Sequence, residues 1–279
     1  MPEKSAHRRG QKPRPSGSKP GQKWGDKPKR ADSRIWLYGR HAVAAALQNP
    51  ARKIRRLAAT KNAHDWLRET LPDDLFHRLE IEDLRPDAID KLLPIGSVHQ
   101  GLALFTDPLE RARLRDVCKA DRPGPVIILD QITDTQNIGA IFRNAAAFGA
   151  QGVIFQDRRT PPLSGALAKA AVGALETVPA ISVVNIARAL EALNEIGFRT
   201  VGLAGETDQA LADIPRDRPI ALVMGAEGAG LRQLVRETCS TIARIPICET
   251  MESLNVSSAT AISLYEITRG TITKQPTAP

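Results

Sequence analysis

The chain alternates between short apolar runs and segments in which apolar residues recur with helical spacing, beginning at Arg34. Up to residue 106, this pattern predicts strands at 54–60, 76–82 and 100–105 and helices within 35–49, 64–71 and 87–93. Such a succession predicts a small α/β domain over residues 34–106. The segment 107–123 contains two prolines and a charged run, so we expect a linker there.

A second alternation follows the linker. Its predicted strands are 125–130, 152–155, 180–184, 200–205, 220–225 and 242–247, and its predicted helices are 137–149, 165–176, 187–197, 231–239 and 255–270. The apolar runs do not alternate with polar residues, which is typical of parallel strands covered on both faces. We therefore expect a doubly wound α/β domain over residues 124–272, with a tail at 273–279 and a ligand site beyond the carboxyl ends of the strands.

Composition narrows the class of protein. Of the 279 residues, 42% are hydrophobic and 25% are charged, as in ordinary globular proteins. No apolar run approaches the ~18 residues of a membrane span, and no secretory signal is visible, so we expect a cytoplasmic protein. Three cysteines without metal-ligand spacing and five scattered histidines predict reduced thiols and no metal site.

Basic residues are concentrated at the start of the chain. Residues 1–34 contain eleven Lys or Arg and three acidic residues, whereas the remaining 245 residues carry 28 of each sign. Because residues 1–33 also lack apolar residues for a core, they predict a disordered basic arm. Such an arm attracts nucleic-acid phosphates, and Trp24 within it can stack on a base. The alternative is a solubilising tail or a transit peptide.

The loop after the strand at 125–130 contains the first candidate site. Asn137 and Gly139 open the next helix, and Arg143 lies one turn beyond Gly139 on the same face. In a functional interpretation, Arg143 stands over a bare stretch of backbone. In the structural alternative, Asn137 caps the helix and Arg143 is simply solvated.

The loop after the strand at 220–225 is rich in glycine, with Gly225, Glu227, Gly228 and Gly230. Glycines allow a ligand to approach the backbone, and the helix that follows presents free N–H groups. The order is the reverse of the dinucleotide fingerprint, and the sequence contains no phosphate-binding P-loop motif. This loop favours a nucleotide-cofactor pocket of another kind, although such a turn can also be only a turn.

The last candidate loop joins the strand at 242–247 to the final helix. It contains Glu252, Ser253, Leu254 and Asn255. Asn255 or Ser253 can cap that helix, but a single cap leaves the other polar residues unexplained.

Taken together, the three loops resemble a known family. The sequences LDQITDTQNIGAIFRNAAAFGA, IALVMGAEGAGL and IPICETMESLNVSSATAI resemble, in order and spacing, the three motifs of the SpoU (TrmH) family of RNA ribose 2'-O-methyltransferases. The resemblance extends over residues 35–270 and includes YGRHAVAAALQNP and VHQGLALF near the start. It implies a C-terminal trefoil knot that forms an S-adenosyl-L-methionine pocket, a homodimer, and a smaller N-terminal RNA-binding domain.

The resemblance also implies site residues. Those matching the family's cofactor-binding positions are Leu203, Gly205, Gly225, Ile245, Ile247 and Leu254, and those matching catalytic or supporting positions are Asn137, Arg143, Glu227, Ser253 and Asn255. This chain departs from the family at two positions, with Thr135 in place of Pro and Glu249 in place of Gly.

The same resemblance implies the reaction and its substrate. Among family members, the N-terminal domain is typical of enzymes that methylate a guanosine of 23S-type large-subunit rRNA. A tRNA substrate and a non-catalytic RNA-binding role in ribosome assembly are the alternatives. A guanidinium stays protonated in nearly all settings, so we expect Arg143 to clamp a phosphate and stabilise the developing alkoxide rather than act as a base.

Overall fold

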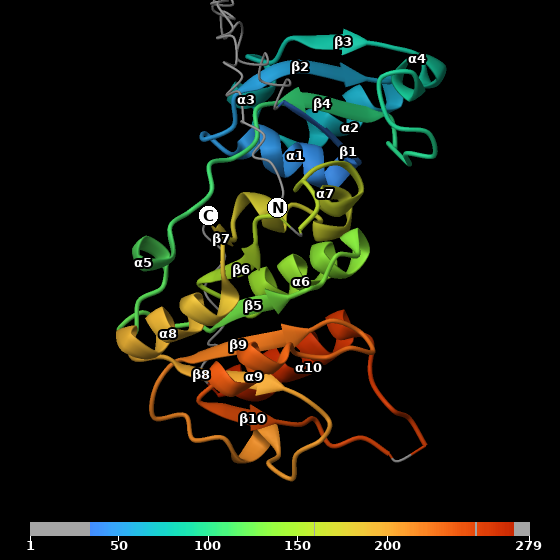
Figure 1. The fold of residues 1–279 in the computed structure, drawn as a ribbon. Helices are drawn as coiled ribbons and strands as arrows, with labels where there is room; N and C mark the ends of the chain where they lie inside the picture. Colours follow the sequence, from blue (N-terminus) through green and yellow to red (C-terminus); the bar gives the residue numbers. More distant parts are fainter. Residues whose placement is uncertain (1–33, 159, 249, 271–279) are drawn as a thin grey trace, which may run out of the picture. The chain divides into compact units, whose positions relative to one another are not determined.

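The computed structural model describes residues 34–270 except 159 and 249. The predicted basic arm at 1–33 and the predicted tail at 273–279 therefore lie outside the described residues. The described part of the chain contains two β-sheets, one of four strands and one of six (Figure 1). No helix in this part is both long enough and apolar enough to cross a membrane.

The four-stranded sheet belongs to the first part of the chain. Its strands, in spatial order, are β1 (Ile35–Tyr38), β4 (Leu102–Thr106), β2 (Ile54–Ala59) and β3 (Ile81–Asp83). β4 pairs antiparallel with β1 and β2, and β3 joins β2 in parallel. The helices are α1 (Arg40–Gln48), α2 (Lys61–Thr70), α3 (Asp73–Phe76) and α4 (Pro86–Asp90).

Alternate strand residues place two different cores on this sheet. Leu37, Leu57 and Leu104 share a buried cluster with Val43 of α1 and Leu67 of α2. The opposite side chains Tyr38, Ala58 and Ala103 pack instead with Ile89 of α4. The period of two in the strands thus directs α1 and α2 to one face and α4 to the other.

The strand predicted at 76–82 is wrong in its first half. Pro72 and the two aspartates after it begin the helical turn α3, and the backbone amide of His77 still donates to the carbonyl of Asp73. Phe76 stacks on His64 of α2, with 5.5 Å between the ring centroids. The apparent alternation in this segment arises because one apolar residue ends a helical turn and a later one begins β3.

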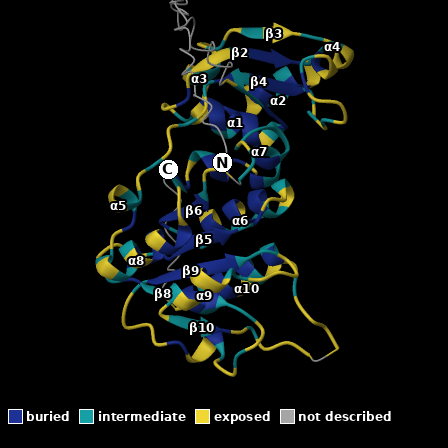
Figure 2. Ribbon diagram, in the orientation of Figure 1, coloured by how far each residue is buried: buried dark blue, intermediate teal, exposed yellow. Residues whose placement is uncertain are grey.

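The six-stranded sheet is entirely parallel, as predicted. Its order is β10 (Thr241–Ala243), β8 (Arg199–Leu203), β9 (Ile220–Gly225), β5 (Val126–Asp130), β6 (Gly152–Gln156) and β7 (Ala180–Val183). Its main helices are α6 (Thr135–Ala147), α7 (Gly165–Ala171), α8 (Ile186–Ile196), α9 (Gln233–Thr238) and α10 (Val256–Thr268). The central strands are buried along nearly their whole length (Figure 2).

Both faces of this sheet are covered. Ile127 and Leu129 share a cluster with residues of α6, α7 and α10, whereas Val126 and Ile128 share another with residues of α8 and α9. The first cluster continues into the four-stranded sheet's core. This arrangement explains why the strands read as continuous apolar runs.

The structure shortens several predicted elements and adds others, among them β1 at the start of the segment 35–49. The helix predicted at 165–176 breaks at Val172 (φ 52°) and Gly173 (φ 89°), where a Cβ on Gly173 would lie 2.7 Å from the Cβ of Ala45, and resumes as a 3-10 turn, η1 (Ala174–Glu176). β10 ends at Ala243 because the backbone of Arg244 pairs instead with Gln209 and Leu211. The predicted linker contains a short helix, α5 (Leu114–Val117).

A buried ion pair joins the segment before β2 to η1. Arg52 and Glu176 approach to 2.7 Å, and their side chains are only 2% and 5% exposed. The Glu176 carboxylate also accepts a hydrogen bond from Asn49 (2.8 Å), and Arg52 donates to the carbonyl of Asp107 (3.1 Å). Every charged atom of the pair therefore has a polar partner despite its removal from water.

We expect Arg52→Ala to lower the free energy of unfolding by about 3–5 kcal/mol, because it leaves the Glu176 carboxylate buried without its counter-charge. Urea denaturation followed by circular dichroism measures this change. The matched control is Arg115→Ala, which removes an ion pair with Glu195 whose side chains are 66% and 67% exposed. The control should cost less than about 1 kcal/mol. Equal losses in the two variants would contradict this assignment.

Candidate active site

The carboxyl ends of neighbouring strands bring the three candidate loops together. Asp130 at the end of β5 pairs in register with Gly225 at the end of β9. Leu203 at the end of β8 pairs with Ala243 at the end of β10. Since all four strands are parallel and adjacent, the segments that follow them begin along one edge of the sheet.

A hydrogen-bonded network of three side chains links these segments. The Oε1 atom of Glu227 accepts hydrogen bonds from the side-chain amides of Asn137 (3.2 Å) and Asn255 (2.8 Å), and from the backbone amide of Val256 (3.3 Å). The amide of Asn255 also donates to Oδ1 of Asn137 at 2.9 Å. One residue from each predicted motif therefore meets at a single carboxylate.

The helix caps decide between the alternatives left open by the sequence. Asp134, not Asn137, caps α6, because its Oδ1 accepts from the backbone amide of Asn137 at 2.7 Å. The side chain of Asn137 is thereby free to join the network. Asn255 both caps a helix and joins the network. Its Oδ1 caps α10 by accepting from the backbone amides of Ser257 (3.0 Å) and Ser258 (3.3 Å), while its amide nitrogen donates to Glu227.

Thr135 is the first residue of α6. This is a position where proline is favoured but where its missing N–H has no helical role. The departure from the family's Pro therefore leaves the start of α6 intact. Glu249, the other departure, lies outside the described residues.

The glycine-rich loop is a tight hairpin that has no room for side chains at its base. A Cβ on Gly225 would lie 2.4 Å from the carbonyl carbon of Gly230, and Gly228 and Gly230 have positive φ angles of 76° and 64°. Ala226 and Gly230 exchange backbone hydrogen bonds of 3.2 and 2.9 Å. Glu227 follows Ala226 directly, so this turn presents its carboxylate to Asn137 and Asn255.

The sequence interpretation missed an ion pair that closes this hairpin. Asp130, whose side chain is fully buried, accepts hydrogen bonds from the backbone amide (2.9 Å) and the Nε (2.8 Å) of Arg232. The pair ties the end of β5 to the residue just before α9. The sequence did contain a signal for this pair, since Asp130 ends a run of apolar residues predicted to be buried. A buried charge requires a partner.

The predicted cofactor positions follow the same strand ends. Leu203 ends β8, Gly225 ends β9 and Ile245 lies two residues beyond β10. Gly205 is exposed, with no heavy atom within 4 Å of the position that a Cβ would take. Ile247, which is 39% exposed, and the partly exposed Leu254 lie on the connection between β10 and α10. Open backbone and exposed apolar side chains of this kind are typical of a nucleoside pocket.

Two predicted residues stay outside the network. Arg143 is exposed on α6 and makes no hydrogen bond or ion pair with the residues that the structure describes, and Ser253 is exposed on the connection before α10. Gly139 does not open a space beneath Arg143, because α7 fills it. A Cβ on Gly139 would lie 2.5 Å from the Cβ of Ala170, so this glycine serves close helix packing.

The cysteines are free thiols in the described structure. Burial raises the pKa of Cys118 to about 11 and that of Cys239 to about 12, and the charge of Asp130 adds to the latter. Both therefore stay protonated and unreactive at neutral pH. Within residues 34–270, apart from the two undescribed positions, no group of three His, Cys, Asp or Glu residues is placed to hold a metal ion.

Comparisons with known proteins cover both parts of the chain. Residues 124–265 match the family model described as SpoU rRNA Methylase family, and residues 36–112 match the model described as RNA 2'-O ribose methyltransferase substrate binding. The chain is 37% identical over 237 residues to the 23S rRNA (guanosine-2'-O-)-methyltransferase RlmB of Vibrio cholerae, covering 84% of this chain and 96% of the relative. It is 44% identical over 242 residues to the RlmB of a Burkholderia species, with 84% and 95% covered.

Solved structures share the fold. The SpoU methyltransferase AviRb of Streptomyces viridochromogenes, in complex with AdoMet, superposes with a TM-score of 0.71 at 24% identity, covering 85% of this chain and 90% of that one. An rRNA methyltransferase of Sinorhizobium meliloti gives a TM-score of 0.71 at 23% identity, with 86% and 89% covered.

Substitutions at Asn255 should separate its two roles. We expect Asn255→Ala to lower the free energy of unfolding by about 1 kcal/mol or more, because it removes the cap of α10 and a hydrogen-bond donor to the Glu227 carboxylate. Asn255→Asp keeps a capping oxygen but places a second carboxylate beside Glu227. Two ionised carboxylates repel each other, so this variant should approach the wild type below about pH 4, where carboxylates become protonated, and lose stability towards pH 7.

Urea denaturation of both variants and the wild type across that pH range measures the difference. If the Asn255→Asp penalty did not change with pH, Asn255 and Glu227 would not be in contact.

Proposed function

We infer, because this chain belongs to the SpoU rRNA methylase family, that it transfers a methyl group from S-adenosyl-L-methionine to a ribose 2'-hydroxyl of RNA. The substrate is a guanosine of 23S rRNA. This is the substrate in the names of the RlmB relatives, which match this chain over most of their length. The main observation in support of this function is that one chain matches both family models, the substrate-binding model at 36–112 and the methylase model at 124–265. The meeting of Asn137, Glu227 and Asn255 is consistent with it.

We propose that the cofactor lies along the ends of β8, β9 and β10. Bound S-adenosyl-L-methionine supplies a methyl group on a positively charged sulfur. The residues proposed to hold it are Leu203, Gly205, Gly225, Ile245, Ile247 and Leu254. The open backbone at Gly205 and the partly exposed side chains of Ile245 and Leu254 support this placement. In the trefoil knot that we propose for this domain, the connection from β10 to α10 completes the pocket.

We propose that Arg143 acts on the RNA. It is exposed on α6, six residues after Asn137, and it has no partner among the described residues to neutralise it. A free guanidinium can bind a phosphate through two parallel hydrogen bonds and can stabilise negative charge developing on the 2'-oxygen. The proton of the 2'-hydroxyl then passes to water or to a neighbouring group, since the guanidinium cannot accept it.

Glu227, Asn137 and Asn255 are proposed to hold the loops in position. The Glu227 carboxylate accepts three N–H groups, so its charge is directed into the protein and not towards an alkoxide. This arrangement makes Glu227 an organiser of the site rather than a base. Ser253 lies on the same connection as Leu254, and we propose that it contacts the bound nucleotide.

A homodimer is the proposed assembly. On α10, Ile262 is 44% exposed and Tyr265 is 60% exposed, and on the adjacent α6, Ala146 and Ala147 are exposed. α6 and α10 pack together, with Asn144 donating to the carbonyl of Ser257 at 3.0 Å. These apolar residues could be buried by the same surface of a second copy, and Arg143 on the same helix would then lie near that interface.

The function is tested by incubating the protein with methyl-labelled S-adenosyl-L-methionine and total RNA from cells that lack it. Alkali-resistant label in large-subunit rRNA is expected, because 2'-O-methylation blocks cleavage of the adjacent phosphodiester. Label in tRNA would show that the substrate is tRNA instead of rRNA. Tight RNA binding without any label would indicate a non-catalytic ribosome-assembly factor instead of an enzyme.

Substitution of Arg143 tests its proposed role. We expect Arg143→Ala to lower kcat by about 10²–10³-fold and Arg143→Lys to recover only part of it, because an ammonium cannot form the bidentate contact. Affinity for S-adenosyl-L-methionine, measured by calorimetry, should not change. Near-normal activity of the lysine variant would exclude a bidentate role.

A further inference from the structure

One face of the four-stranded sheet carries a row of aromatic and arginine side chains. Trp36 of β1, Phe105 of β4 and Arg56 of β2 are cross-strand neighbours in the sheet register. They lie on the face opposite the α1 and α2 core, and each keeps part of its surface exposed. α4 packs on this face further along, over Tyr38, Ala58 and Ala103.

The two aromatic rings pack against each other at a tilt. The rings of Trp36 and Phe105 are 4.9 Å apart between centroids, with 33° between their planes. The Arg34 guanidinium lies over the Phe105 ring, 5.1 Å from its centroid. On the other side, two hydrogen bonds of 2.8 Å to Glu82 hold the Arg56 guanidinium in place. We call Arg34, Trp36, Phe105 and Arg56 the stacking row.

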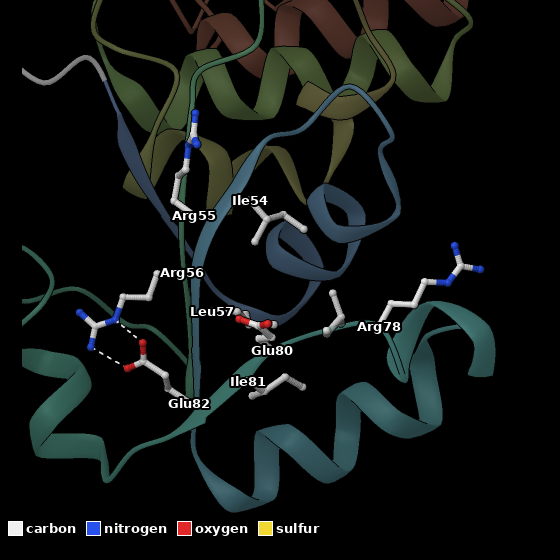
Figure 3. Close-up of a pocket in the computed structure, with 9 residues that line it drawn as sticks. Ile54, Arg55, Arg56, Leu57, Arg78, Glu80, Ile81 and Glu82 are labelled. Atoms are coloured by element: carbon white, nitrogen blue, oxygen red, sulfur yellow. Dashed lines mark hydrogen bonds and ion pairs between the residues drawn. The ribbon is translucent and has the colours of Figure 1, made fainter.

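Figure 3 shows how the end of the row is built. Arg56 and Glu82 lie together on one side of β2, and Ile54 and Ile81 lie on the other. The ion pair with Glu82 therefore fixes the position of the Arg56 guanidinium beside β2.

Positive charge borders the stacking row. Asp107, just after β4, forms a two-bonded ion pair with Arg55 (2.7 and 3.0 Å). Its pKa is lowered first by the hydrogen bond from Arg55, and the charges of Lys53 and Arg34 lower it further. Three cations thus surround one carboxylate, which leaves a net positive rim.

These features fit unpaired nucleotides better than a protein partner. Aromatic rings and guanidinium planes stack on bases of any sequence, and a positive rim attracts the phosphates between them. A duplex hides the faces of its bases and can contact only the rim. An acidic peptide would use the cations but would leave the two rings without a planar partner.

Building on the proposed function, we propose that the stacking row binds unpaired bases of the RNA substrate, with Trp36 and Phe105 as the principal stacking residues. The stacking row raises the affinity for the substrate and makes the protein prefer single-stranded over double-stranded RNA. The methyl-transfer site lies at the other sheet and does not include these residues.

The test compares binding of a short single-stranded oligoribonucleotide with binding of the same oligonucleotide annealed to its complement. We expect Phe105→Leu and Trp36→Leu each to weaken single-strand binding between about 5-fold and 100-fold, the range of one base-stacking contact. Binding of the duplex should be unchanged, and Trp36→Phe should retain most of the affinity. In methylation assays, KM for rRNA should rise while kcat is maintained.

Phe76→Leu is the matched control. Phe76 is also a partly buried phenylalanine of this domain, but it packs against the α1 and α2 core. It should leave RNA binding unchanged, and thermal unfolding of every variant checks that the fold is intact.

Equal losses for single-stranded and duplex RNA, or wild-type affinity in both leucine variants, would overturn the proposal. A wild-type protein that binds RNA through the stacking row but transfers no methyl group would instead overturn the proposed function.

Discussion

A single carboxylate oxygen holds the three loops of the site together. Glu227 Oε1 accepts from Asn137, Asn255 and the start of α10, so the position of each loop depends on the other two. Its own position depends on a hairpin whose base excludes any side chain at Gly225 and whose end is tied to β5 by Asp130 and Arg232. A polar network with unpaired members is less stable than an apolar contact in its place. This arrangement is therefore stable only when all of its members are present.

The sequence predicted the parallel sheet well because its signal is local. Continuous apolar runs separated by helical repeats require only that each strand be buried on both faces. One failure has a local cause, because Pro72 and two aspartates begin a helical turn within an apparent strand. The other has a distant cause, because Gly173 breaks a helix where Ala45 of α1 comes close, and hydrophobic periodicity does not show such an approach.

The site was predicted less evenly. Asn137, Glu227 and Asn255 were identified through the resemblance, but residue spacing alone could not show that they contact one another, since they lie on three segments joined only through the sheet order. The role of Gly139 was misread because the helix that packs on it, α7, follows some thirty residues later. Asp130 ends an apolar run in the sequence, but only the fold shows that Arg232, 102 residues later, is its partner.

The contacts that build the site span long stretches of chain. Asn137 reaches Glu227 across 90 residues and Asn255 across 118, and Asp130 reaches Arg232 across 102. Ordering such distant segments carries a larger loop-closure entropy than ordering nearby ones, so these bonds require most of the domain to be in place. During synthesis, Asn255 and α10 are also among the last described parts of the chain to be made. The proposed site is therefore complete only once α10 has been made, and a nascent chain that has folded the four-stranded sheet alone still lacks the contacts that hold the three loops together.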